Sequence, residues 1–241
     1  MLKETKYNII GDIHGMDVWK SLVKDDCINV FVGDFFDPYT YSIPFEKCAG
    51  NFREIIALKK SRPETILLYG NHELHYLYYG EIEERYSRFD ENHAMEIQQL
   101  LKENDSYFHG VAYSINDQYL VTHAGVSRYW YHQYFGSYER QSPNEVAAQV
   151  NNLWELTYRP FLVRENRSFD LVSEGPTQSP LWIRSWILER YNLFEGTSYI
   201  QIVGHTPCAQ VKESNGLVFI DCLRQGLKTK PEQTSFLIVQ H

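Results

Sequence analysis

Short apolar runs that end abruptly in a polar cluster recur along this chain. Each run holds about five residues rich in Ile, Val and Tyr, which is typical of strands and too short for helices. The glycine in each cluster marks the end of a strand. The runs cover residues 7–10, 28–32, 65–69, 118–122 and 199–203, and the clusters after them are Gly11-Asp12, Gly33-Asp34, Gly70-Asn71-His72, His123-Ala124-Gly125 and Gly204-His205.

The segments between the first three runs have the pattern of helices. Within residues 45–56 apolar side chains recur at the spacing of one helix face, and residues 16–23 offer a shorter helix. The order strand, helix, strand, helix, strand predicts a parallel sheet with right-handed crossovers. A later helix is expected over residues 143–157, because Ser142 and Glu145 form a capping box in front of an apolar stripe.

The second half of the chain also predicts antiparallel pairing. Residues 107–115 and 118–122 flank the turn residues Asn116-Asp117, which favours a hairpin. Late strands are expected over residues 216–221 and 234–239. The predicted fold class is therefore α/β with a mixed sheet system.

Composition restricts the class of protein. The chain has 241 residues, 43% of them hydrophobic and 22% charged, which is close to globular averages. We expect a single domain over residues 1–241, because no repeat or Gly/Ser-rich linker divides the sequence. No stretch approaches the roughly 20 apolar residues of a membrane span, so no membrane partner is expected. The N-terminus lacks an apolar signal region, which favours a cytoplasmic location with reduced cysteines.

The chain is acidic but rich in histidine. Its formal charge is −8, and its largest basic cluster is the short stretch from Lys59 to Arg62. Broad electrostatic capture of nucleic acid is therefore not expected. The chain also carries nine histidines, and histidines with carboxylates are the ligands of metal sites.

Asp, Asn and His side chains follow all five runs. Ligands of open α/β sheets bind at the carboxyl ends of the strands, where the loops converge. Imidazole and carboxylate groups suit divalent first-row metals, and their number exceeds the three or four protein ligands of one catalytic ion. We therefore predict two metal ions about 4 Å apart that share a carboxylate and clamp the oxygens of a displacement at phosphorus. The side chains are Asp12, His14, Asp34, Asn71, His72, His123 and His205.

These residues belong to five ordered motifs: Gly11-Asp12-Ile13-His14-Gly15, Gly33-Asp34-Phe35-Phe36-Asp37, Gly70-Asn71-His72-Glu73, His123-Ala124-Gly125 and Gly204-His205-Thr206. In this order they resemble the motifs of the calcineurin-like metallophosphoesterases. The Gly-Asn-His-Glu and Gly-His-Thr forms are similar to the phosphoprotein phosphatase branch, of the lambda phage phosphatase and symmetrical diadenosine tetraphosphatase type. The resemblance implies the metallophosphoesterase sandwich, in which two mixed β-sheets pack face to face and are flanked by helices.

The resemblance also implies how the ligands divide between two divalent ions. Manganese is the favoured metal, and Fe, Zn, Co or Ni accept the same ligand types. The implied ligands are Asp12 and His14 for the first ion, Asp34 as the bridge, and Asn71, His123 and His205 for the second ion.

His72 is left off the metals by the same resemblance. It would stand beside the phosphate as the general acid that protonates the leaving oxygen, and Asp37 would orient it. The implied nucleophile is a metal-bound hydroxide, because coordination lowers the pKa of water.

One part of the family pattern is missing. Phosphoprotein phosphatases usually continue their second motif with Asp-Arg-Gly, and that arginine grips the phosphate, whereas this chain has Asp37-Pro38-Tyr39. A guanidinium group can engage two phosphate oxygens at once. Arg184 resembles the arginine that bacterial and phage relatives place before the last histidine motif, and the resemblance therefore implies that it binds the substrate. Arg128, just after the His123 motif, is the second candidate.

Each motif residue taken alone has an ordinary structural interpretation. Asp12 could cap a helix, and Asp34 or Asp37 could serve a turn. These interpretations would all have to hold at consecutive strand ends, so the metal site is the preferred hypothesis. Residues 74–92, rich in Tyr and Glu, are interpreted as a solvated loop, with a lid or substrate wall beside His72 as the alternative.

The predicted function is metal-dependent hydrolysis of phosphomonoesters, on Ser, Thr or Tyr of a phosphoprotein or on a small phosphoester. A hydrolase of dinucleoside polyphosphates or small phosphodiesters would use the same metals with a different outer wall. A non-catalytic metal-binding scaffold is a further alternative, motivated by the missing arginine after Asp37. Retention of His72 argues against it, because a scaffold needs no acid. The oligomeric state is left open.

Overall fold

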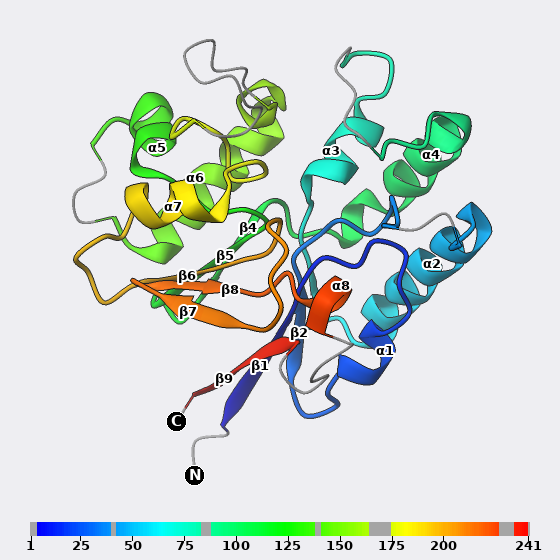
Figure 1. Cartoon of the computed structure of the whole chain (residues 1–241), viewed down its shortest axis with the longest axis horizontal. Coiled ribbons are helices and arrows are strands. Elements are labelled where there is room, and N and C mark those ends of the chain that lie inside the picture. Colours follow the sequence, from blue (N-terminus) through cyan, green and yellow to red (C-terminus); the bar gives the residue numbers. More distant parts are fainter. Residues whose placement is uncertain are drawn as a thin grey trace.

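Two β-sheets form the centre of the molecule, with helices on both sides (Figure 1). The structure is a computed structural model that describes residues 4–39, 42–82, 88–137, 141–163, 175–226 and 234–240. In one sheet the strand order is β3-β2-β1-β9, and in the other it is β4-β5-β6-β8-β7. The strands are β1 (Thr5–Ile10), β2 (Ile28–Phe31), β3 (Ile66–Leu67), β4 (Ala112–Ile115), β5 (Tyr119–Thr122), β6 (Ile200–Val203), β7 (Lys212–Ser214), β8 (Leu217–Phe219) and β9 (Ser235–Gln240).

Both sheets are mixed, as expected. β1, β2 and β3 run parallel, and β9 pairs antiparallel with β1. β5, β6 and β8 also run parallel, whereas β4 and β7 pair antiparallel with β5 and β8. The predicted hairpin is confirmed as β4 and β5. Its first strand is shorter than expected: β4 begins at Ala112, and Tyr107 belongs to a 3-10 helix.

The two sheets share an apolar core. Side chains alternate along a strand, so Tyr7 and Ile9 of β1 point to the same face, and Ile10 points to the other. Tyr7 and Ile9 pack with Val121 and Ile202 of the other sheet. Ile10 belongs to a separate cluster that includes Phe52 and Ile55 of the helix over residues 45–61. Both faces of β1 are therefore buried, which confirms two sheets packed face to face and flanked by helices.

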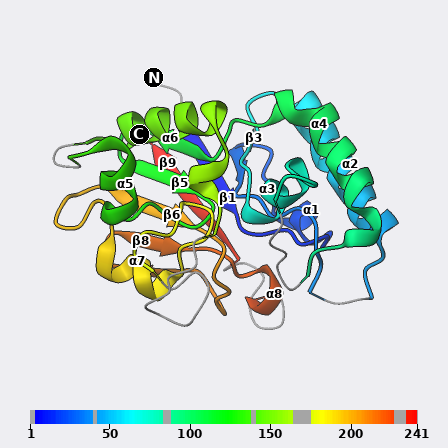
Figure 2. The same ribbon diagram turned by 90° about the horizontal axis from the view of Figure 1, so that it is seen from above.

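The helices cover the outer faces of the sheets (Figure 2). α1 to α4 lie beside the four-stranded sheet, and α5 to α7 lie beside the five-stranded sheet, where α6 packs on β4 and β5. The helices are α1 (Trp19–Leu22), α2 (Phe45–Ser61), α3 (Asn71–Leu77), α4 (Ala94–Asn104), α5 (Arg128–Phe135), α6 (Pro143–Leu156), α7 (Ser185–Tyr191) and α8 (Leu223–Gly226), with 3-10 helices η1 (Glu91–His93), η2 (Asp105–Tyr107) and η3 (Arg159–Phe161).

Three of these helices were expected from the sequence. α2 buries Phe52 and Ile55 on the predicted face, and α6 begins with the predicted capping box of Ser142 and Glu145. The helix expected over residues 16–23 is reduced to the short α1. Within the described residues, none of the helices is long and apolar enough to cross a membrane.

Candidate metal centre

The carboxyl ends of five strands meet at one edge of the two sheets. β1, β2 and β3 lead into Asp12 and His14, Asp34 and Asp37, and Asn71 and His72, while β5 and β6 lead into His123 and His205. The six predicted metal ligands are each at most 7% exposed. The structure therefore brings together residues that are up to 193 positions apart.

Asp12, His14 and Asp34 form a first group of potential ligands. His14 Nε2 lies 3.5 Å from Asp34 Oδ2 and 4.0 Å from Asp12 Oδ2. His14 Nδ1 donates to the Phe36 carbonyl at 3.0 Å, which leaves the Nε2 lone pair for a metal. His123 Nε2 also lies 3.5 Å from Asp34 Oδ2. This oxygen faces both groups of ligands, which is the position that a bridging carboxylate requires.

Asn71, His123 and His205 form the second group. His123 Nε2 lies 2.8 Å from Asn71 Oδ1 and 3.2 Å from His205 Nδ1, and that nitrogen lies 3.0 Å from the same Asn71 oxygen. The other ring nitrogens already donate, from His123 to the Val32 carbonyl at 2.9 Å and from His205 to the Trp182 carbonyl at 3.1 Å. The facing atoms are therefore three acceptors. Acceptors this close repel one another unless a cation lies among them, so the donor set fits a divalent metal.

Burial sets the protonation of these groups. It raises the pKa of Asp34 to about 7 and lowers the pKa of His123 to about 3, because the buried surroundings disfavour charge. His14 and His205 have their pKa lowered well below the usual range for the same first cause. The three histidines are neutral at pH 7, which is the state that binds a metal.

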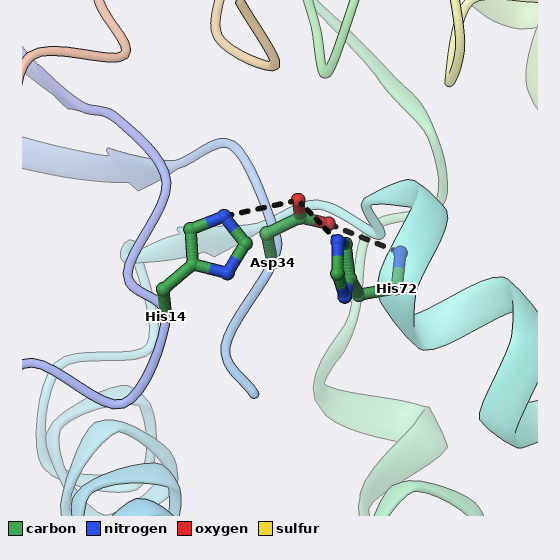
Figure 3. Close-up of side chains that lie close together, drawn as sticks. All are labelled: His14, Asp34 and His72. Atoms are coloured by element: carbon green, nitrogen blue, oxygen red, sulfur yellow. Dashed lines mark hydrogen bonds and ion pairs between the residues drawn. The ribbon is translucent and has the colours of Figure 1, made fainter. Parts of the chain in front are cut away.

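His72 lies beside the first group, opposite His14 (Figure 3). Its Nε2 is 3.7 Å from Asp34 Oδ2, and its Nδ1 donates to Asp37 Oδ2 at 2.5 Å. The other oxygen of Asp37 accepts from the Tyr76 hydroxyl. By distance alone His72 could join Asp34 and His14 on a metal. The same contacts leave its Nε2 facing the space beside the carboxylate, where a reacting group would stand.

Four residues of the site have a left-handed backbone conformation. His14, Asp34, Asp37 and His205 have positive φ values of 44°, 54°, 58° and 62°. This left-handed region is uncommon for residues other than glycine, and such strain gathers at functional sites. At Gly204 an added Cβ would lie 2.1 Å from Asp12 Oδ1, so the carboxylate fits only because this residue is glycine.

Glu73 ties two of the motifs together. Its carboxylate accepts from the backbone N–H groups of Asp34, Phe35 and Gly70 at 2.7, 2.8 and 2.9 Å. Burial, followed by the charge of Asp34, raises the pKa of Glu73 to about 8. The motif containing Glu73 was noted in the sequence, but its function as a clamp on the loop after β2 was not.

The two predicted substrate-binding arginines lie in different places. Arg184 Nη1 donates to the carbonyl of His205 at 3.4 Å, and burial lowers its guanidinium pKa, opposed by Tyr39 and the carboxylates of the site. Arg128 instead forms an exposed ion pair with Glu195 and donates to the Arg190 carbonyl at 3.2 Å. The structure therefore places Arg184, and not Arg128, at the cluster.

Two further residues at the centre were missed by the sequence reasoning. Asp221 follows β8, is 1% exposed, and has no hydrogen-bond partner for either carboxylate oxygen within the described structure. Burial, followed by the charge of Asp34, raises its pKa to about 7. The strand-end pattern that led to the predicted ligands could have found it. Arg88, from the segment interpreted as a solvated loop, lies within 3.4 Å of both His14 and His72, and no local motif marks it.

A pocket of about 530 Å³ opens beside Asp37. Its walls combine the cation of Arg88 with acidic and aromatic side chains. They include Tyr39, Phe45, Phe89, Asp90, Glu91 and His93. The space beside the proposed acid can therefore receive a group larger than water.

Comparisons with known proteins agree with this arrangement. The profile of the family described as calcineurin-like phosphoesterase matches residues 5–219. A protein serine/threonine phosphatase from Saccharomyces cerevisiae, with similarity to human phosphatase PP5, has a TM-score of 0.51 at 17% identity, over 89% of this chain and 66% of that chain. A metallophosphoesterase from Sphaerobacter thermophilus has a TM-score of 0.31 at 18% identity, over 50% of this chain and 47% of that chain. No curated protein sequence matches this chain.

Proposed function

The chain belongs to the calcineurin-like phosphoesterase family, a family of metal-dependent phosphoester hydrolases, and from this premise we propose that it is a phosphomonoesterase. The proposed substrate is a dianionic phosphate on a protein Ser, Thr or Tyr, or on a small molecule. The observation that carries the proposal is the position of His72, whose Nε2 faces Asp34 while its Nδ1 is held by Asp37.

The proposed metal ligands are the six residues of the two groups. When bound, two divalent ions would lower the pKa of water and neutralise charge on the phosphate oxygens. These ligand types bind several divalent first-row metals, so the metal that is available decides which one is bound. Manganese is the proposed ion. Asp12 and His14 would hold the first ion, Asp34 both, and Asn71, His123 and His205 the second.

His72 is proposed as the general acid. The oxygen that leaves phosphorus carries a negative charge unless it receives a proton, and His72 Nε2 is the ring nitrogen that faces Asp34, at 3.7 Å from its Oδ2. Burial and then the charge of Arg88 hold the pKa of His72 below its usual range. A phosphate dianion in contact with the ring favours the protonated form and raises this pKa again.

The binding of a dianion is supported by the charges around the centre. Arg184 is half-buried, and its positive charge acts on Asp34, Asp12 and Asp221. A monoester offers two negative charges to such a group, whereas a diester offers one. This difference favours the monoesterase over the diesterase. The ordered acid argues against a scaffold without activity.

The test compares three substrates with the manganese-loaded protein: an aryl phosphate, the corresponding bis-aryl phosphate, and diadenosine tetraphosphate. We expect the highest kcat/KM for the monoester. A higher value for the diester or for the dinucleotide would refute the monoesterase, and no turnover of any of the three would favour the scaffold. Phosphopeptides carrying phosphoserine, phosphothreonine or phosphotyrosine then separate the protein substrates from small phosphoesters.

A further inference from the structure

Arg88 lies where the second motif lacks its arginine. The residue after Asp37 is Pro38, which has no donor to offer a phosphate. Arg88 is 51 positions further along the chain, yet its Nη1 donates to the Asp37 carbonyl at 2.8 Å. This carbonyl belongs to the peptide bond that joins Asp37 to Pro38. A guanidinium group from another segment therefore stands beside the position of the missing one.

The fork of Arg88 faces the two histidines beside Asp34. Its Nη1 lies 3.4 Å from His14 Nδ1, and its Nη2 lies 3.4 Å from His72 Nε2. His14 Nδ1 gives its hydrogen to the Phe36 carbonyl, so it offers Arg88 no lone pair. The donors of the guanidinium are therefore only partly used by the protein.

The remaining contacts of Arg88 hold its position without neutralising its charge. The guanidinium lies 4.1 Å from the centre of the Tyr39 ring, and the guanidinium of Arg224 lies 4.2 Å from the same ring. A cation over an aromatic face is attracted to it and keeps its hydrogen-bond donors available. Among the ion pairs of the described residues, none includes Arg88.

The position of His72 shows where an acceptor for the Arg88 donors would lie. As the proposed acid, His72 donates from Nε2 to the leaving oxygen, and Arg88 Nη2 beside it can only donate. When the ring is neutral, His72 Nε2 accepts from Arg88 Nη2 at 3.4 Å. Once the ring is protonated, both nitrogens donate and need a shared acceptor group, which the oxygens of a phosphate supply. Arg184 approaches from the side of His205. Arg88 would thus bind the phosphate from the side of His14 and His72, and Arg184 would bind it from the side of His205.

We propose that Arg88 binds the substrate phosphate and replaces the arginine that is missing after Asp37. The inference deepens the proposed function and rests on it. It assigns substrate binding to Arg88 itself, and it makes a terminal phosphate dianion the favoured ligand.

The test measures the binding of inorganic phosphate to the manganese-loaded protein by calorimetric titration. Arg88→Met removes the charge at similar length, Arg88→Lys keeps the charge without the fork, and Arg53→Met changes an exposed arginine of α2 as the matched control. We expect Kd to rise about 10- to 100-fold in Arg88→Met, by less in Arg88→Lys, and not in Arg53→Met.

The metal content of each variant separates binding from structural support. We expect Arg88→Lys to keep the metal content of the unsubstituted protein. A Kd in Arg88→Met within twofold of the unsubstituted protein would overturn the proposal, and so would loss of metal from Arg88→Lys, which would assign Arg88 to the support of His14. Phosphate binding that depends on Arg88 in a protein without monoesterase activity would refute the proposed function and sustain this inference.

Discussion

His72 Nδ1 lies 2.5 Å from Asp37 Oδ2, and both side chains are buried. Tyr76 donates to the second oxygen of Asp37 and in turn accepts from the backbone N–H of Asp90 at 2.8 Å. Asp37 is thus fixed from both sides and fixes the ring of His72. The hydrogen on Nδ1 leaves Nε2 as the nitrogen that can exchange a proton with a substrate.

Asp37→Asn is expected to lower kcat by about 10²-fold. His72 and Tyr76 donate to different oxygens of Asp37, so in the amide one of these two donors faces an NH2 group that cannot accept. Tyr76→Phe is the matched variant, because it keeps the acceptor for His72, and we expect it to lower kcat by less. Metal content should stay unchanged in both. Unchanged turnover in Asp37→Asn would remove Asp37 from the mechanism.

Gly204→Ala is expected to reduce metal occupancy while the protein remains folded. The new Cβ would lie 2.1 Å from Asp12 Oδ1 and would displace that carboxylate. Elemental analysis of the purified variant measures the loss. Gly50→Ala is the control, because nothing lies within 4 Å of its added Cβ in α2, and it should raise stability by about 1 kcal/mol. Full metal content in Gly204→Ala would contradict the role of Asp12.

Glu73→Ala is expected to lower the free energy of unfolding by about 3 kcal/mol or more. The change leaves three backbone N–H groups without their acceptor, at about 1–3 kcal/mol for each buried group. Relief of repulsion with Asp34 offsets part of this loss. Thermal unfolding checks the result against Glu96→Ala, an exposed change in α4 that should leave Tm unchanged. Equal Tm values for the two variants would contradict the clamp.

Manganese should stabilise the protein more at pH 8 than at pH 6. The pKa of Asp34 is raised to about 7 in the folded chain from an ordinary value of 3.8. The contribution of this shift to the free energy of unfolding is fully present below about pH 4 and is lost as the pH rises through 7. A cation reverses that loss and binds without competition from protons at the higher pH. The Tm difference between manganese-loaded and chelator-treated protein measures the effect, and a smaller difference at pH 8 would contradict it.

The strand ends were predictable because the information is local. Each apolar run is followed directly by its polar residue, so Asp12, Asn71 and His123 could be placed at one sheet edge before any contact was known. The second sheet was expected only from the resemblance. β7 has three residues and β3 two, and such short strands leave little periodicity to read.

The residues that the sequence did not identify act over long distances. Arg88 reaches Asp37 across 51 positions from a segment whose composition is that of a solvated loop. Its position depends on contacts with Tyr39 and with the Asp37 carbonyl, which are distant in sequence, so no local spacing pattern marks it. Arg128 shows the opposite error, since it follows a site motif but turns away to Glu195.

The most direct test of the account is His72→Asn, measured for both metal content and turnover. We expect two metal ions per chain, as in the unsubstituted protein, and a kcat about 10² to 10⁴-fold lower with an aryl phosphate. Loss of one metal ion would show that His72 is a ligand beside His14 and Asp34. Undiminished turnover would contradict its role as the acid.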